Sequence, residues 1–116
     1  MNNKFFNDKS LNFISFSKRY IEYLSHILKK LDKKKIEKLL KLLERARKRN
    51  QTVFVAGNGG AAATSITMAN DLGFDILKKT KVERTFKIQS LNENPSVLTA
   101  IANDTGYENI FLNQLK

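Results

Sequence analysis

The stretch that most constrains the fold of this chain is residues 52–61, Thr-Val-Phe-Val-Ala-Gly-Asn-Gly-Gly-Ala. A short run of β-branched and aromatic residues ends in a glycine cluster, and small residues with a helical pattern follow it. This order predicts a strand, a tight turn and the start of a helix, as in α/β proteins that bind anionic ligands. Glycine lets the backbone adopt positive φ and approach a ligand closely, so amides at the turn can donate to phosphate or sugar oxygens.

Two other interpretations of the glycine cluster remain open. Gly57-x-Gly59-x-x-Ala62 formally fits the dinucleotide-binding fingerprint, but that fingerprint requires a carboxylate about 20 residues later, at the end of the next strand. Glu93 comes too late to serve as that carboxylate. A turn that carries glycine for its geometry alone is the second alternative, because connections from strand to helix often do so.

The composition limits the classes of protein to which the chain can belong. A length of 116 residues allows one small domain. The absence of cysteine excludes disulfides, thiol catalysis and cysteine metal sites. No apolar run approaches the roughly 18 residues of a membrane helix, and the N-terminus lacks the apolar core of a secretory signal. We therefore expect a cytoplasmic protein with no membrane partner.

The net charge of +10 raises the question of nucleic-acid binding. Eleven basic residues and three acids lie between positions 29 and 49, which gives that segment a charge of +8. Regularly spaced leucines separate the charges, so the solvated face of an amphipathic helix is the expected explanation. No aromatic residues alternate with the basic ones, as a platform for stacking single-stranded bases would require. A nucleic-acid partner is therefore not expected.

Two helices are predicted before the glycine cluster, and together they are expected to form a hairpin domain over residues 1–50, which in an oligomer would pack against a neighbour. Apolar residues at steps of three and four predict a helix with one buried stripe over residues 11–31. Asp32 caps a second helix that ends near residue 49, with Asn50 at the C′ position. Arg47 falls on the apolar stripe of this second helix. Either the buried face has ended there, or the arginine stem packs while its head reaches water.

Residues 51–116 are predicted to alternate strands and helices, as in a parallel sheet. The expected elements are a strand over 52–56, a helix over 61–72 that Gly73 ends, a loop over 74–84, a strand over 85–91, and a helix over 96–102 capped by Asn94. A break over 103–106 precedes an amphipathic helix from residue 107. Two strands are too few for a doubly wound sheet, so we expect the chain to be part of a larger assembly or of a longer protein.

Two carboxylates in this half have plain structural explanations. Thr67 and Asp71 are four residues apart and share one helix face. In its plain structural explanation Asp71 is a carboxylate in water near the C-terminal end of the helix, where the helix dipole disfavours a negative charge. From spacing alone, Asp104 is an ordinary turn residue.

At this point the residues resemble a known family. Ala-Gly-Asn-Gly-Gly-Ala at 56–61, Ala-Asn-Asp-Leu at 69–72, and Ser-Leu-Asn-Glu-Asn-Pro-Ser-Val-Leu-Thr-Ala-Ile-Ala-Asn-Asp-Thr-Gly-Tyr-Glu-Asn-Ile-Phe at 90–111 resemble the first half of the sugar isomerase (SIS) domain of phosphoheptose isomerases. The resemblance implies an α/β fold, in which an N-terminal helical hairpin precedes a flavodoxin-like parallel-sheet SIS domain. Residues 51–116 would form the first part of that SIS domain, which is truncated.

The resemblance also implies a function. The family isomerises sedoheptulose 7-phosphate, an aldose–ketose conversion through an enediol, in the synthesis of heptose for lipopolysaccharide and other surface polysaccharides. Its members are homotetramers and often bind zinc. By position, Asp71 corresponds to the catalytic and metal-binding residue, and Thr67 to a second metal ligand. Substrate contacts are expected at Gly57, Asn58, Gly59, Gly60, Ala61, Asn103 and Asp104.

Three of these positions depart from the family pattern. Asp71 replaces a glutamate, Thr67 replaces a histidine, and Ala61 replaces a serine. Aspartate is shorter than glutamate, and threonine is a poor zinc ligand. The phosphate-binding loop and the second catalytic half of the family lie outside the chain. The 116-residue chain alone is therefore predicted to be inactive.

Two alternatives to an isomerase stay open. One is a non-catalytic SIS-type module that binds a sugar phosphate or serves as an adaptor, as in a family relative that associates with the replication initiator. The other, ranked last, is nucleic-acid binding through the lysine-rich helix.

Overall fold

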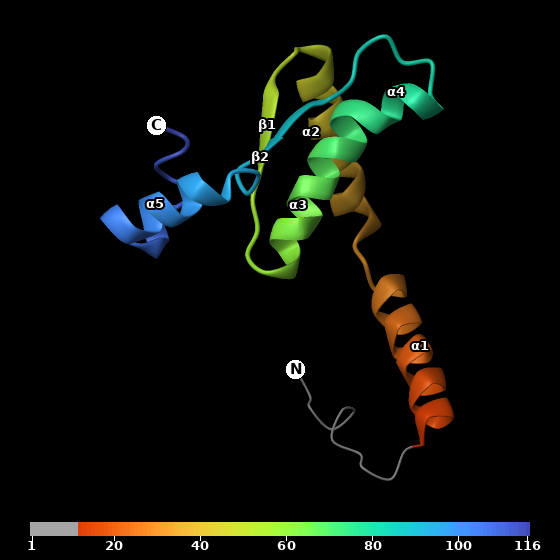
Figure 1. The fold of residues 1–116 in the computed structure, drawn as a ribbon. Coiled ribbons are helices and arrows are strands. Elements are labelled where there is room, and N and C mark those ends of the chain that lie inside the picture. The colour runs from red at the N-terminus through yellow and green to blue at the C-terminus, as the bar shows by residue number, and fades with distance from the viewer. Residues whose placement is uncertain (1–11) are drawn as a thin grey trace. The chain divides into compact units, whose positions relative to one another are not determined.

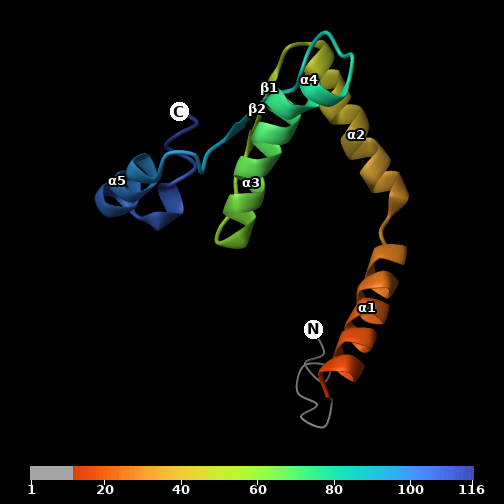
Figure 2. The ribbon, with the colours of Figure 1, turned by 45° about the vertical axis from the view of Figure 1, so that its right-hand side comes forward.

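A computed structural model describes residues 12–116. The predicted hairpin includes residues 1–11, which lie outside the described part. The chain divides into two compact units, with the boundary between Glu37 and Lys38. Figure 1 and Figure 2 show the order of the elements along the chain.

Helices α1 (Phe13–Lys29) and α2 (Lys33–Lys48) form where the apolar spacing predicts them. The predicted cap of α2 is confirmed, because Asp32 Oδ1 accepts hydrogen bonds from the amides of Lys34 and Lys35 at 3.0 and 3.2 Å. The expectation of a buried stripe is wrong for the chain by itself, since no residue of either helix is buried. Leu39 and Leu40, for example, are 55% and 59% exposed.

The C-terminus of α2 confirms the role predicted for Asn50. Its φ of 54° lies in the left-handed region. The amide of Gln51 donates to the carbonyl of Ala46 at 2.9 Å, and the amide of Asn50 donates to that of Arg47 at 3.1 Å. These two bonds form a Schellman motif, which turns the chain from α2 into the first strand.

The sheet consists of two parallel strands, β1 (Thr52–Val55) and β2 (Lys87–Ser90), joined by helix α3 (Gly60–Asn70) and the segment that follows it. Thr52 pairs with Lys87 and Val55 with Ser90. The amide of Leu91 donates to the carbonyl of Val55 at 2.9 Å and extends the pairing beyond β2. Helix α3 packs against β2. The predicted parallel α/β order is therefore confirmed.

The helix that begins as α3 does not end at Gly73 as predicted. It continues through a π-helical turn (Asp71–Asp75) into α4 (Ile76–Lys79), so the expected loop over 74–84 begins as helix. Gly73 does not adopt positive φ. It lies where the helix passes close to the segment before β2: the amide of Phe86 donates to the carbonyl of Leu72 at 3.3 Å, and a Cβ on Gly73 would lie 3.7 Å from the carbonyl oxygen of Phe86. That distance is ordinary van der Waals contact, so Gly73 neither caps the helix nor is required by a close approach of the backbone.

Helix α5 (Pro95–Thr105) is longer than predicted. Asn94 caps it as expected, accepting from the amide of Val97 at 3.2 Å. The predicted break at 103 is wrong, because Asn103 and Asp104 form the last turn of α5 and Gly106, with φ of 98°, ends the helix. The interpretation of Asp104 as a turn residue is wrong for the same reason.

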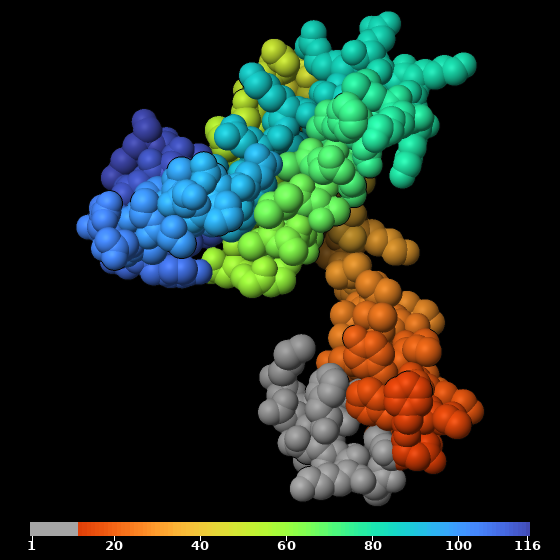
Figure 3. Space-filling view, viewed as in Figure 1, coloured from red at the N-terminus to blue at the C-terminus, as the bar shows by residue number. Residues whose placement is uncertain are grey.

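The chain end forms a 3-10 turn (Tyr107–Asn109) and further turns where an amphipathic α-helix was predicted. Side chains hold this segment by their own hydrogen bonds. The Asn109 amide group donates to the Thr105 carbonyl at 2.6 Å, and that of Gln114 donates to the Leu91 carbonyl at 3.1 Å. Ile110 is buried together with Leu91 and Ala69. Figure 3 shows the blue C-terminal residues beside the green start of α3.

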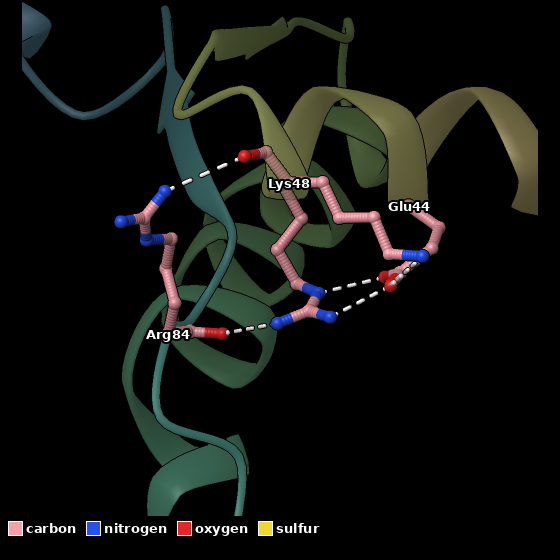
Figure 4. Close-up of polar contacts among 4 residues, drawn as sticks. Glu44, Lys48 and Arg84 are labelled. Atoms are coloured by element: carbon pink, nitrogen blue, oxygen red, sulfur yellow. Dashed lines mark hydrogen bonds and ion pairs between the residues drawn. The ribbon is translucent and has the colours of Figure 1, made fainter.

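The guanidinium of Arg47 joins α2 to the segment before β2 (Figure 4). Its Nε and Nη2 donate to the two carboxylate oxygens of Glu44 at 2.7 and 2.6 Å, and its Nη1 donates to the carbonyl of Arg84 at 2.9 Å. The guanidinium carbon lies 6.0 Å from the ring centroid of Phe86. The Arg47 side chain is 20% exposed, and its head binds Glu44 and Arg84 and does not simply reach water, as the second of the two interpretations expected.

The ion pair predicts a pH dependence of stability. The hydrogen bond from Arg47 holds the pKa of Glu44 below its ordinary value. A carboxyl whose pKa is lower in the folded state stabilises the fold above its unfolded pKa, about 4.3, and loses that contribution as the pH falls through the folded pKa. We therefore compare the urea concentration at the midpoint of unfolding for the native chain and for Glu44→Gln. As the pH is lowered below about 4.3, this midpoint should fall more steeply for the native chain. Parallel curves for the two proteins would contradict this account.

Candidate functional site

The glycine turn between β1 and α3 depends on two glycines for different reasons. Gly59 has φ of 56°, which confirms the predicted positive φ. A Cβ on Gly57 would lie 2.4 Å from the carbonyl carbon and oxygen of Ala61, so Gly57 is required by close approach of the backbone. Gly60 begins α3, and a Cβ added there would project into open space.

The turn uses some of its amides internally and leaves others available. Ala61 and Ala62 donate to the carbonyls of Asn58 and Gly59 at 3.1 and 3.0 Å. Within residues 12–116, the amides of Asn58, Gly59 and Gly60 have no hydrogen-bond partner. These three exposed residues therefore supply the donors that the sequence predicted for an anionic ligand.

Asn92 fixes the position of the turn. Its side chain accepts from the amide of Gly57 at 2.9 Å and donates to the carbonyl of Gly57 at 2.9 Å. The parallel register explains the match, because Val55 pairs with Ser90 and the residues two positions further, Gly57 and Asn92, then face each other. A primary amide satisfies both backbone groups of Gly57 at once.

A buried serine pair supports Asn92. The hydroxyls of Ser65 and Ser90 lie 2.8 Å apart, and Ser65 Oγ lies 2.9 Å from Asn92 Oδ1. The amide of Asn92 donates to Ser90 Oγ at 3.1 Å. Ser65, Ser90 and Asn92 are 5%, 3% and 8% exposed, and within the described residues no buried side-chain polar atom lacks a partner. This network joins α3, β2 and the glycine turn, and the sequence analysis missed all three residues.

A hollow of about 300 Å³ opens between the glycine turn, α5 and the 3-10 turn. The Tyr107 hydroxyl donates to Asn58 Oδ1 at 2.9 Å across it. Tyr107 was also missed, because it follows the predicted break in a segment for which no contact could be assigned. The lining residues are Gly57, Asn58, Gly59, Ala62, Asn92, Leu98, Thr99, Ala102, Tyr107 and Ile110.

The predicted site residues fall in several places. Gly57, Asn58 and Gly59 line the hollow at the turn, and Gly60 begins α3 beside it. Ala61 lines a different hollow next to β1, with Phe54 and Met68.

The remaining predicted residues lie on α3, at the start of the π-helical turn that follows it, and on α5. Thr67 and Asp71 line a third hollow, of about 510 Å³, along α3. Asn103 and Asp104 are exposed on α5, where the Asn103 side-chain amide donates to Asp104 Oδ1 at 3.0 Å, and neither lines the hollow at the turn. The structure therefore brings Gly57, Asn58 and Gly59 to one hollow, which neither Asp71 nor Asp104 lines.

The residues near Asp71 do not fit a zinc site. Zinc sites in proteins use three or four nitrogen, sulfur or carboxylate ligands. Thr67 and Asp71 supply one hydroxyl and one carboxylate, and among residues 12–116 no group of three histidine, cysteine or acidic side chains is close enough to hold a metal. The single histidine of the chain, His26, lies in α1.

Comparison with known proteins assigns the family. The family model described as "SIS domain" matches residues 16–116. This chain belongs to the SIS domain family. One relative is the phosphoheptose isomerase of Geotalea daltonii, which is 37% identical over 71% of this chain and 41% of that protein. Another is a phosphoheptose isomerase of Helicobacter pylori, which is 35% identical over 82% of this chain and 50% of that protein. The resemblance to phosphoheptose isomerases is thereby confirmed.

A solved structure supports the fold. The phosphoheptose isomerase from Neisseria gonorrhoeae superimposes with a TM-score of 0.57 at 23% identity, over 85% of this chain and 52% of that one. The SIS chain thus has a partial SIS fold, with N-terminal helices followed by two parallel strands, and spans about half the length of the relatives it matches. Within residues 12–116, no helix is long and apolar enough to cross a membrane.

The glycine turn gives a matched pair of variants. Gly57→Ala places a methyl group against the backbone of Ala61 and should lower the free energy of unfolding by about 1–3 kcal/mol. Gly60→Ala makes the same chemical change where there is open space, and should be neutral or slightly stabilising. Urea unfolding followed by circular dichroism compares them, and equal effects at the two positions would contradict the described turn.

Proposed function

We propose that this chain is the N-terminal part of a phosphoheptose isomerase-like SIS protein that acts on sedoheptulose 7-phosphate. The reaction is an aldose–ketose isomerisation, in which a general base transfers a proton through an enediol. The proposed setting is heptose synthesis for lipopolysaccharide and other surface polysaccharides, in the cytoplasm. The proposal includes a homotetramer, for which the exposed apolar side chains of α1 and α2 would supply contacts.

The observation that carries the proposal is the fixed glycine turn, whose free amides and polar side chains border the hollow. Three free amides at Asn58, Gly59 and Gly60 can donate to an anionic or hydroxyl oxygen, and the Tyr107 hydroxyl and Asn58 carboxamide lie at the same opening. Neutral donors and acceptors of this kind suit the many hydroxyls of a sugar. Because Asn92 holds both backbone groups of Gly57, the donors are positioned before a ligand binds.

The catalytic step has weaker support within this chain. Asp71, proposed as the base, is exposed and lies along α3 among Ala63, Thr67 and Met68, outside the hollow at the turn. A base must come within hydrogen-bond reach of the proton that it removes. We therefore propose that the 116-residue chain alone does not isomerise the sugar, and that turnover requires the other half of an SIS domain.

A second candidate is a non-catalytic SIS module that binds a sugar phosphate or serves as an adaptor. The surroundings of Ala61 favour it, since Ala61 lines a hollow with Phe54 and Met68 and contributes no hydroxyl there. Thr67 beside Asp71 likewise provides no strong metal ligand. Such a protein would bind the ligand without converting it.

A chimera separates the two candidates. The SIS chain is fused to the remaining half of the Helicobacter pylori relative, and sedoheptulose 7-phosphate is followed by NMR for both binding and isomerisation. The unfused chain should give no turnover. In the chimera, Asp71→Glu should raise kcat by at least about 10-fold, because the longer side chain restores the reach of the base. Asp75→Glu is the matched control, since Asp75 pairs with Lys78 at 2.9 Å.

The outcomes of the chimera experiment are distinct. Turnover by the unfused chain would contradict the requirement for a second half. An equal effect of Asp71→Glu and Asp75→Glu would remove Asp71 as the base. Binding without turnover, even after Asp71→Glu is combined with Thr67→His and Ala61→Ser, would favour the non-catalytic module.

A further inference from the structure

Two basic segments that are far apart in the sequence meet in the second compact unit. Residues 38–49 form most of α2 and its end, and residues 78–87 include the end of α4 and the start of β2. Together they hold eleven basic residues and two acids, so these 22 residues carry +9 of the chain's net +10. The sequence analysis considered the first segment alone, as a helix face, and treated the second as part of a loop and a strand.

Hydrogen bonds join the two segments. Arg47 Nη1 donates to the Arg84 carbonyl at 2.9 Å, and Arg84 Nη1 approaches the Lys48 carbonyl at 3.4 Å (Figure 4). A hollow of about 500 Å³ lies at the junction, lined by Arg47, Lys48, Val82, Glu83 and Arg84. The backbone contacts therefore hold like charges close together, where they repel one another unless an anion lies nearby.

Acidic side chains neutralise only part of this charge. Glu44 accepts two short hydrogen bonds from Arg47 and also lies 3.8 Å from the Lys48 ammonium, and Asp75 Oδ1 accepts from the Lys78 ammonium at 2.9 Å. The Lys48 side chain nevertheless remains 71% exposed. Arg45, Arg49, Lys81 and Arg84 are exposed as well. We call the exposed cations of residues 38–49 and 78–87 the basic surface.

The cations on α2 form a regular stripe. Lys38, Lys41, Arg45 and Lys48 follow at steps of three, four and three, which places them on one helix face. The leucines at 39, 40 and 43 lie on the opposite face, and Leu42 lies beside the stripe, next to Lys38 and Arg45. Successive cations are about 5 Å apart along the axis, from a rise of about 1.5 Å per residue. A linear row of positive charge fits a linear row of negative charge, and the apolar face stays available for other contacts.

We propose that the basic surface binds the phosphate backbone of a nucleic acid. Phosphates repeat at short, regular intervals along a strand, and lysine and arginine neutralise them without reading the sequence. A lipid surface would need a row of apolar side chains beside the cations, whereas here Leu42 borders the stripe and the leucines at 39, 40 and 43 face away from it. The absence of alternating aromatic residues weighs against stacking on single strands and not against backbone contacts. This function is separate from sugar binding at the glycine turn.

Fluorescence anisotropy with a labelled DNA duplex tests the proposal on the full chain. Binding should be independent of the duplex sequence. The affinity should fall on the order of 100-fold between about 50 and 200 mM salt, as expected when about four phosphates are neutralised. No binding at the lower salt concentration would overturn the proposal.

Variants of equal charge locate the contact. Lys48→Gln, Lys81→Gln and Arg84→Gln combined should weaken binding at least about 10-fold. The control is a triple variant that removes the same charge from α1 and its end, namely Lys18→Gln, Lys29→Gln and Lys30→Gln. It should change the affinity less than about threefold. Circular dichroism checks that each protein is folded. If the first variant unfolds, it is replaced by a triple variant of α2 and its end, namely Lys38→Gln, Arg45→Gln and Arg49→Gln. An equal loss in the α1 control would mean general charge attraction and would overturn the proposal.

Competition distinguishes other polyanions. Unlabelled duplex should displace the labelled duplex, whereas phosphatidylserine vesicles and poly-glutamate at equal charge concentration should displace little of it. Displacement by vesicles as effective as that by DNA would assign the surface to membranes instead. Equal displacement by poly-glutamate would assign it to acidic proteins.

Discussion

The pair of hydrogen bonds between Asn92 and Gly57 is the interaction on which the ligand-binding half of this chain depends. Both backbone groups of Gly57 lie at the end of a parallel strand, where the ladder no longer supplies partners, and one carboxamide satisfies both at 2.9 Å. An unpaired backbone group in a partly buried place is costly, so the turn and β2 are held in one arrangement. The free amides at Asn58 to Gly60 owe their position to this contact.

The buried serines explain why a small domain can hold an asparagine in this place. Ser65 Oγ bears a single proton, which the Ala62 carbonyl and Asn92 Oδ1 compete to accept or share, and Ser65 can accept a proton only from the Ser90 hydroxyl. Ser90 can donate to Ser65 while it accepts from the Asn92 amide. The network is therefore complete without water, and it ties α3 to the sheet at a point where the apolar core contains only small contributions from Ala69, Leu91 and Ile110. Arg47 supplies a comparable polar tie at the other end of the sheet, between α2 and Arg84.

Local features could be predicted from the sequence, and contacts that depend on register could not. The caps by Asp32 and Asn94, the C′ role of Asn50 and the positive φ of Gly59 follow from residue type and nearest neighbours. Gly73 misled because a glycine inside a continuing helix has the same sequence signal as one that caps a helix. Asn92 was missed because its partner is 35 residues away and becomes evident only when β1 and β2 are paired. The family motif was evident in the sequence, but it did not show that Asp71 and Asp104 do not line the hollow at the glycine turn.

Amide hydrogen exchange at Gly57, measured by NMR, tests the central claim most directly. In the native chain the Gly57 amide should be protected, because it donates to a buried side chain. In Asn92→Ala its protection should be lost, while the Leu91 amide, which donates to Val55, should keep most of its protection and so report that the strands remain paired. Unchanged protection of Gly57 in this variant, with Leu91 protected as before, would show that Asn92 does not hold the turn and would contradict the account.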